Sequence, residues 1–236
     1  MLIKHVLYLG SDPSRFFCSA EVKITHLPLF EVVPRDYTLP SLLCVLSDWH
    51  DYSHMIFTSK HAVSVLVEAL TYHVLPPPKK ESVVIAIGKS TAKVLEQRGW
   101  KVSFCAVEER QEGILSLLRS IEWKEESYAF YPRSSLARKS LEVFLLEREI
   151  RHQVCDLYDT VAKSVDLWPD LEAFDEIFFT SPSTVAIFFS KITALPKRPQ
   201  LKAIGPITFE ALMSYSRLDK AHFAKFETCY YDRSAN

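Results

Sequence analysis

The chain has 236 residues, which is enough for one large domain or for two smaller domains that each bury a core. Hydrophobic residues make up 48% of it and charged residues 24%, and this composition excludes a disordered or fibrous protein. The 28 basic and 29 acidic residues leave a net charge of -1, without the clustered lysines and arginines of a nucleic-acid or anionic membrane surface. We therefore expect neither nucleic acid nor membrane as a partner.

The sequence contains no apolar run long enough to cross a bilayer, and the apolar stretch at 6–9 is too short for the core of a signal peptide. We therefore expect a cytoplasmic protein. The cysteines are odd in number and include no C-x-x-C pair, which predicts reduced core thiols rather than disulfides or a zinc site. They are Cys18, Cys44, Cys105, Cys155 and Cys229.

The first elements predicted along the chain are strands at 5–9 and 24–33, followed by a helix after Leu39. A polar stretch then carries Asp48, His50, Asp51 and His54, in which two histidines lie four residues apart beside carboxylates. Such spacing on a helix would suit a metal ion, but the stretch is better interpreted as a solvated loop that would not fix the ligand positions.

Two motifs occur twice in the same order. Phe57-Thr58-Ser59 followed by Val63 matches Phe179-Thr180-Ser181 followed by Val185, and Ala86-Ile87-Gly88 followed by Thr91 matches Ala203-Ile204-Gly205 followed by Thr208. Each copy ends an apolar, β-rich run and begins an amphipathic helical pattern. The order of strand, T-S turn, helix, strand, G-x-x-T turn and helix has therefore been used twice.

Between the two copies the sequence predicts strands at 127–131 and 153–161, with helices after Gly113 and Ser135. The tail after Arg217 shows no clear final helix. Alternating strands and helices predict an α/β fold of two domains, each with a parallel sheet and helices on both faces. Because one complete copy lies inside the chain, we expect residues 38–160 to form an inserted domain within a discontinuous domain of 1–34 and 163–236. A two-stranded antiparallel connector would join them and leave a cleft.

Turns that lead from a strand into a helix expose polarised N–H groups, and a serine or threonine there can cap the helix or bind an anion. Both roles remain open for Ser59, Ser183, Thr91 and Thr208. Gly88 and Gly205 mark places where the backbone must turn tightly or approach a ligand. Several such turns could together hold a polycarboxylate without a basic patch.

Three further side chains are candidates for the site. Arg133 precedes a predicted helix that would begin after Ser135, and it is the preferred carboxylate ligand over Arg138, which we expect on the first turns of that helix. A solvated surface arginine is the alternative, and the same alternatives apply to Lys60 and Lys89. Tyr158 lies at the end of the inserted domain, where a protonated phenol could donate a proton or a hydrogen bond.

The sequence lacks G-x-S-x-G, P-loop, H-E-x-x-H and G-x-G-x-x-G motifs, so cofactor chemistry is not expected. In their order and spacing, the motifs resemble the uroporphyrinogen-III synthase family. The motifs are F-T-S-K-H-A-V, A-I-G-K-S-T-A, Y-P-R-S-S-L-A-R, L-Y-D-T-V, F-T-S-P-S-T-V and A-I-G-P-I-T-F-E-A-L. This resemblance implies two α/β domains on a two-stranded connector and a lyase that needs neither a metal nor an organic cofactor.

The resemblance also implies a substrate, the linear tetrapyrrole hydroxymethylbilane, which loses its terminal hydroxyl and closes with inversion of ring D to uroporphyrinogen III. By the family pattern, Tyr158 matches the cleft tyrosine proposed to assist hydroxyl departure, and Thr91, Ser181 and Thr208 match the polar positions of the two domain edges. Ser59, Arg133, Gly88 and Gly205 fall in the same turns. We expect a monomeric enzyme that acts in heme biosynthesis. The alternatives are a non-catalytic two-domain protein that binds a small anion and a phosphosugar or nucleotide enzyme.

Overall fold

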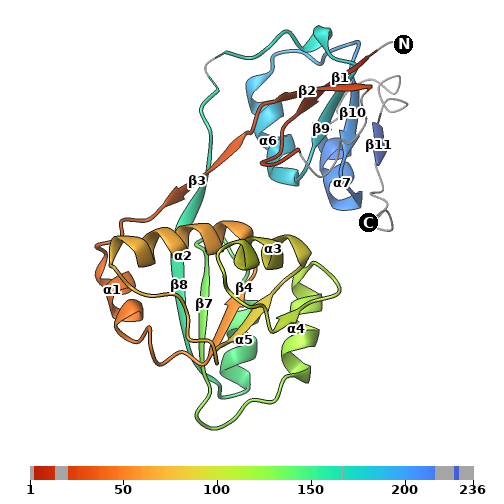
Figure 1. Cartoon of the computed structure of the whole chain (residues 1–236). Helices are drawn as coiled ribbons and strands as arrows, with labels where there is room; N and C mark the ends of the chain where they lie inside the picture. Colours follow the sequence, from red (N-terminus) through yellow and green to blue (C-terminus); the bar gives the residue numbers. More distant parts are fainter. Residues whose placement is uncertain (1–2, 14–20, 166, 216–225, 229–236) are drawn as a thin grey trace. The chain divides into compact units, whose positions relative to one another are not determined.

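The computed structural model describes residues 3–13, 21–165, 167–215 and 226–228 (Figure 1). The chain forms two compact units. Unit 1 contains Met1–Glu31 and Val161–Asn236, and unit 2 contains Val32–Thr160, so the chain passes between the units twice. The domain limits expected from the sequence, 1–34 with 163–236 and 38–160, remain a proposal about which segments fold as domains.

Unit 2 is built on a sheet with the strand order β3-β8-β7-β4-β5-β6. Neighbouring strands from β8 to β6 are parallel. β3 is antiparallel to β8, because Arg35 N donates to Leu157 O at 2.9 Å and Lys163 N donates to Leu29 O at 2.9 Å. The strands are β3 (Phe30–Pro34), β4 (His54–Phe57), β5 (Val83–Ala86), β6 (Phe104–Cys105), β7 (Tyr128–Ser134) and β8 (Arg151–Ala162).

Helices cover both faces of this sheet. Successive side chains of a strand point to opposite faces, so each face presents apolar side chains against which helices pack. Phe57 of β4 packs with α1 (Pro40–Ser47), α2 (Lys60–Tyr72) and α3 (Lys89–Gln97). Ile56, its neighbour, packs on the other face with α4 (Gln111–Ser120) and α5 (Ser140–Glu147). Both side chains are fully buried, and burial of each stabilises the fold by about 1.5–3 kcal/mol.

Unit 1 contains a parallel sheet with the order β11-β10-β9-β1-β2. Its strands are β1 (Lys4–Tyr8), β2 (Val22–His26), β9 (Glu176–Phe179), β10 (Gln200–Ala203) and β11 (Phe226–Thr228). The 3-10 helix η1 (Leu171–Ala173) and the helices α6 (Pro182–Lys191) and α7 (Pro206–Tyr215) pack with one face of the sheet. Val6, Tyr8 and Phe178 form the opposite cluster, to which no helix of the described residues contributes. The expected covering of both faces therefore describes unit 2 but not the described part of unit 1.

The structure confirms the duplicated plan at the level of single residues. β4 ends at Phe57 and α2 follows with Ser59 as its N-cap, while β9 ends at Phe179 and α6 follows with Ser181 as its N-cap. The second motif behaves in the same way, since β5 ends at Ala86 before α3 and β10 ends at Ala203 before α7. In each unit the two strands of the repeat are parallel neighbours, so both turns lie at the same edge of their sheet.

Three expected elements are wrong in extent. The single strand expected at 24–33 is two strands in different sheets, β2 and β3, separated by a segment with Pro28, which has no N–H to continue a ladder. α4 begins before Gly113, and a Cβ at that position would lie 2.2 Å from the Glu108 carbonyl oxygen. The helix expected after Ser135 begins only at Ser140, so the intervening residues form a loop. In the tail, β11 is described, while 216–225 and 229–236 lie outside the described residues.

The polar stretch before β4 forms turns rather than a metal site. Asp48 ends α1 and accepts hydrogen bonds from Tyr128 at 2.6 Å and Gln153 at 3.0 Å, and His54 is a buried residue of β4. The described residues contain no group of His, Cys, Asp and Glu that could hold a metal ion.

The sequence predicts that the cysteines are core thiols, and this holds for one of the described cysteines. Among the described cysteines, all of which are free, Cys155 is buried, whereas Cys44 and Cys105 are exposed, contrary to expectation. Cys18 and Cys229 lie outside the described residues. Within the described part of the chain, the helices are too short or too polar to cross a membrane.

Candidate active site

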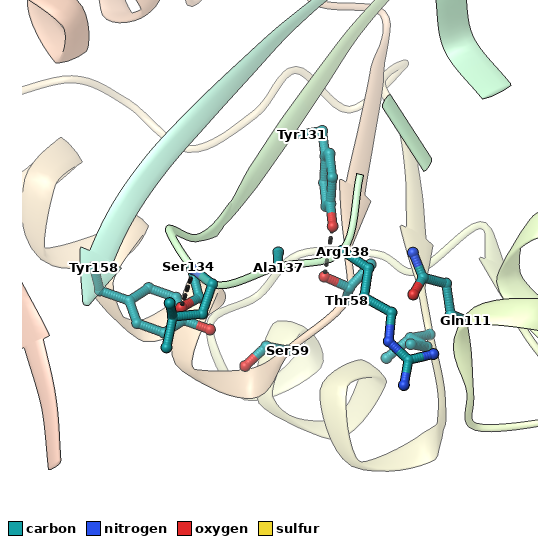
Figure 2. Close-up of a pocket in the computed structure, with 10 residues that line it drawn as sticks. Thr58, Ser59, Gln111, Tyr131, Ser134, Ala137, Arg138 and Tyr158 are labelled. Carbon is teal, nitrogen blue, oxygen red and sulfur yellow. Dashed lines mark hydrogen bonds between the residues drawn. The ribbon is translucent and has the colours of Figure 1, made fainter. Parts of the chain in front are cut away.

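A pocket of about 310 Å³ lies at the carboxyl ends of three neighbouring strands of unit 2 (Figure 2). β4 contributes Thr58 and Ser59 directly after its last residue, and β7 and β8 contribute the other strand residues, because parallel strands end at one edge. The polar residues that line the pocket are Thr58, Ser59, Gln111, Tyr131, Ser134, Arg138 and Tyr158, and the apolar ones are Ile87, Leu136 and Ala137.

Tyr158 brings a buried phenol to this pocket. Its side chain is only 4% exposed, and Figure 2 shows its hydroxyl directed toward Ser59. Burial raises the pKa of Tyr158 above its ordinary value, while a hydrogen bond with Ser59 opposes this rise. The phenol therefore stays protonated at neutral pH and is able to donate.

A β-bulge sets the direction of Tyr158. The register of β7 and β8 shifts between Arg133, which pairs with Asp156, and Ser134, which pairs with Tyr158, so Leu157 is an extra residue on β8. As a result, the consecutive residues Leu157 and Tyr158 pack in the same hydrophobic cluster as Cys155, although alternation would send Tyr158 to the opposite face. The bulge thus directs the phenol toward Ser59 and α2.

The loop from Ser134 to Lys139 forms one wall of the pocket and is tied to β8. Ser135 N donates to Tyr158 O at 3.0 Å, and Ser135 Oγ donates to Asp159. Asp159 in turn accepts two hydrogen bonds from Arg35, each 3.1 Å long, and the hydrogen bond from Arg35 lowers the pKa of that carboxyl. The loop is therefore held in place before any ligand arrives.

Neither Arg133 nor Arg138 lies where the sequence suggested, because Arg133 is a residue of β7 and the following helix begins only at Ser140. Arg133 is 9% exposed, and its guanidinium donates to Asp156 at 2.8 Å and to Glu142 at 2.9 Å. It does not line the pocket, and its assignment as a substrate ligand stays a prediction. Arg138 lies in the loop rather than on a helix, is exposed and lines the pocket. A helix assumed to begin at Ser135 hid this arrangement.

Ser59 caps a helix and also lies at the pocket, while its role as an anion ligand stays a prediction. Its side chain caps α2 by accepting a hydrogen bond from His61 N at 3.1 Å, and it also lines the pocket. An N-cap hydroxyl keeps one proton to donate, and in Ser59 this proton serves the hydrogen bond with Tyr158, with which an anion would compete.

The second turn of unit 2 is already occupied by a carboxylate of the chain. Gly88 is the N-cap of α3, and Lys89 N donates to Glu109 Oε1 at 2.9 Å. A Cβ at Gly88 would lie 2.4 Å from Glu109 Cγ, so the glycine permits this close approach. Thr91 is 2% exposed within α3. The predicted anion position at Gly88 and Thr91 thus holds an internal anion.

Removal of the Glu109 carboxylate tests whether Gly88 and Thr91 bind substrate or are structural residues. If Gly88 and Thr91 bind a substrate carboxylate, Glu109→Ala should lower KM several-fold, because the Lys89 amide no longer has a competing partner. The helix should lose only about 0.3–1 kcal/mol of stability. Steady-state kinetics, with Glu112→Ala on the exposed first turn of α4 as the control, would measure the change. An unchanged KM would leave Gly88 and Thr91 as structural residues.

In unit 1, the predicted residues occupy the corresponding turns. Ser181 forms a capping box with Thr184, in which the backbone N–H of each donates to the other's side-chain oxygen at 3.2 Å. Ser183 is exposed in the first turn of α6, Gly205 has open space where a Cβ would stand, and Thr208 is buried in α7.

Several lining residues were missed by the sequence reasoning. Thr58 and Ser134 stand at strand ends, Gln111 begins α4, and Tyr131 is a strand residue that looks like ordinary core. Thr58 could have been found, because it immediately precedes Ser59 in the duplicated motif. Tyr131 carries no such signal, because its approach to the pocket depends on how β7 and β4 are paired.

Residues 14–217 match the family model described as uroporphyrinogen-III synthase HemD, which is most of the chain. The chain belongs to the uroporphyrinogen-III synthase family. Members of this family are lyases (EC 4.2.1.75) that close the tetrapyrrole ring in heme biosynthesis, and the chain is assigned that class of activity.

The chain is also similar to one relative in sequence and to solved structures in fold. A protein of Methanothermobacter thermautotrophicus named "Putative uroporphyrinogen-III synthase" is 29% identical over 177 residues, which cover 69% of each chain. The uroporphyrinogen-III synthetase of Helicobacter pylori has the same fold, with a TM-score of 0.58 and 23% identity over 89% of this chain and 88% of that one. A mutant uroporphyrinogen III synthase of Thermus thermophilus also has a TM-score of 0.58, with 18% identity over 90% and 89% of the two chains.

Proposed function

We propose that the chain converts hydroxymethylbilane to uroporphyrinogen III, with loss of water and inversion of ring D, and that the pocket of unit 2 contributes to this reaction. The observation that carries the proposal is the family match over residues 14–217. The pocket supports it, because its hydroxyl groups, amide and guanidinium are donors suited to the carboxylates of a tetrapyrrole.

Tyr158 is the proposed general acid. The departing hydroxyl needs a proton as its C–O bond breaks, and a neutral buried phenol at the pocket can supply one. The pocket therefore combines a proton donor with a wall that is held by Asp159 and Arg35. Positioning of the substrate's ends for ring closure would add to the acceleration.

Arg138 is the proposed carboxylate ligand of this pocket. Replacement by leucine removes a charge-assisted hydrogen bond worth roughly 1.5–3 kcal/mol, so we expect KM to rise about tenfold to a hundredfold. Arg138→Lys should lose less, because it keeps the charge without the bidentate geometry. Arg98→Leu, at the exposed C-cap of α3, is the matched control. A KM that moves equally in both leucine variants would contradict this role.

The turns of unit 1 that carry Ser181, Ser183, Gly205 and Thr208 are proposed to bind substrate carboxylates as well, as are Ser59, Gly88, Thr91 and Arg133 of unit 2. We further propose a monomeric enzyme of the cytoplasm that needs no cofactor. The free thiols of Cys44, Cys105 and Cys155 suit a reducing compartment. Analytical ultracentrifugation of the purified chain would test this oligomeric state, and the mass of a single chain is expected.

The decisive experiment uses freshly made hydroxymethylbilane. The purified chain is incubated with it, the products are oxidised, and the type I and type III porphyrin isomers are separated. Type III is expected from the enzyme. If only the spontaneous type I isomer forms while the chain still binds the substrate, the chain is a non-catalytic binding protein and the proposed function is wrong.

A further inference from the structure

Tyr131 brings a second buried phenol to the same pocket. It lies on β7, is 2% exposed and lines the pocket, and Figure 2 shows its hydroxyl directed toward Thr58. The distance between the Tyr131 hydroxyl and Thr58 Oγ1 is 3.4 Å. Tyr131 and Tyr158 therefore lie on neighbouring strands and line one cavity.

The two phenols arrive from opposite faces of the sheet. Tyr158 belongs to the hydrophobic cluster that contains Phe57, whereas Tyr131 belongs to the cluster that contains Ile56. Continued alternation after β4 places Thr58 on the side of Tyr131 and Ser59 on the side of Tyr158. The pocket at the strand ends is thus lined by side chains from both faces of the sheet. Each phenol has its own hydroxyl partner there, Thr58 for Tyr131 and Ser59 for Tyr158.

The Tyr131 hydroxyl is held less firmly than that of a structural tyrosine on the same strand. Tyr128 donates to Asp48 at 2.6 Å and accepts from Gln153 at 2.7 Å, which satisfies its hydroxyl. The 3.4 Å contact of Tyr131 is longer than an ordinary O–H···O hydrogen bond of about 2.7–2.8 Å. Its proton therefore remains available to a ligand in the pocket.

Arg133 lies close to the Tyr131 ring. The guanidinium carbon lies 5.8 Å from the centre of the Tyr131 ring. A positive charge at this distance stabilises the phenolate that remains after a proton has left. Burial opposes this effect, as do the Asp156 and Glu142 carboxylates that pair with Arg133. The pKa of Tyr131 is therefore raised on balance, and the phenol is neutral before the reaction.

We propose that Tyr131 is a second proton donor of the pocket, which can protonate the departing hydroxyl when Tyr158 does not. This inference rests on the proposed function. As the C–O bond breaks, its electron pair leaves with oxygen, which takes the phenolic proton and departs as water. The phenolate regains a proton from the pyrrole carbon that loses one when the ring closes. Tyr158 is the main donor, and Tyr131 completes the cycle more slowly when Tyr158 is absent, so neither is indispensable.

The test compares Tyr131→Phe in the wild-type chain and in a Tyr158→Phe background, using the isomer assay with hydroxymethylbilane. We expect Tyr131→Phe to lower kcat no more than about threefold alone, but at least about tenfold when Tyr158 is already phenylalanine. Phenylalanine keeps the ring that packs on Leu141 and Leu145. Urea unfolding checks that the variants remain folded. Tyr128→Phe, on the same strand, should act equally in both backgrounds.

The outcomes separate the inference from the proposed function. If Tyr131→Phe lowers kcat by the same factor or a smaller one in the Tyr158→Phe background, Tyr131 is a packing residue and the inference is overturned. That result leaves the proposed function intact, because the wild-type chain still forms the type III isomer. Absence of type III from the wild-type reaction overturns both.

Discussion

Tyr158→Phe is expected to lower kcat by at least about 10²-fold, the lower bound typical of a general acid, while KM stays within about twofold. The phenyl ring keeps its packing beside Leu157 and α2, so only the proton donor is lost. Formation of the type III isomer at saturating hydroxymethylbilane, together with the urea midpoint, measures activity and folding separately. An unchanged kcat would remove Tyr158 from the mechanism.

The pH profile gives an independent check on the same residue. The protonated phenol is the active form, so activity should persist below its pKa and fall as the pH rises through it. Because burial raises that pKa, the fall attributable to Tyr158 should come above its ordinary value of about 10. A loss of kcat at lower pH that disappears in Tyr158→Phe would contradict a neutral, buried acid.

Asp156→Ala is expected to lower the free energy of unfolding by about 2–3 kcal/mol, the largest stability effect that we predict. Arg133 is 9% exposed and would retain only Glu142 as a carboxylate partner, so its charge would be buried without full compensation. Arg133 and Glu142 also stand on either side of the loop that carries Arg138, so this change should raise KM as well. Urea unfolding and steady-state kinetics measure the two effects.

Two further variants distinguish a buried charge from a lost surface contact. Glu108→Ala removes an exposed ion pair with Arg110, in which the side chains are 56% and 64% exposed, and should change stability by no more than about 0.5 kcal/mol. Arg133→Met combined with Asp156→Ala should be more stable than Asp156→Ala alone, because the buried cation is gone. If the double variant is the less stable one, burial of the charge is not the cause.

The turns show how far local sequence could predict the site. Ser59 and Ser181 each follow an apolar strand and precede a helical pattern, which predicts strand-to-helix turns. The structure confirms those positions. Parallel pairing then brings such turns to one edge whatever the details of packing. The pocket residues from the loop after β7 cannot be predicted in this way. Ser135 donates hydrogen bonds to Asp159 and to the Tyr158 carbonyl, so these contacts, and not the local sequence, delay the start of α5.

Local sequence is enough to predict the α/β class, the duplicated order of strands and helices, and the turns at which donors are presented. These depend on periodicity and on turn chemistry, which are local properties of the chain. Tertiary contacts set the direction of Tyr158, which follows from a bulge between β7 and β8, and they place Arg138 rather than Arg133 at the pocket. They also bring Tyr131 to the pocket. Each of these depends on the register between segments distant in sequence, and hydrophobic patterning leaves that register open.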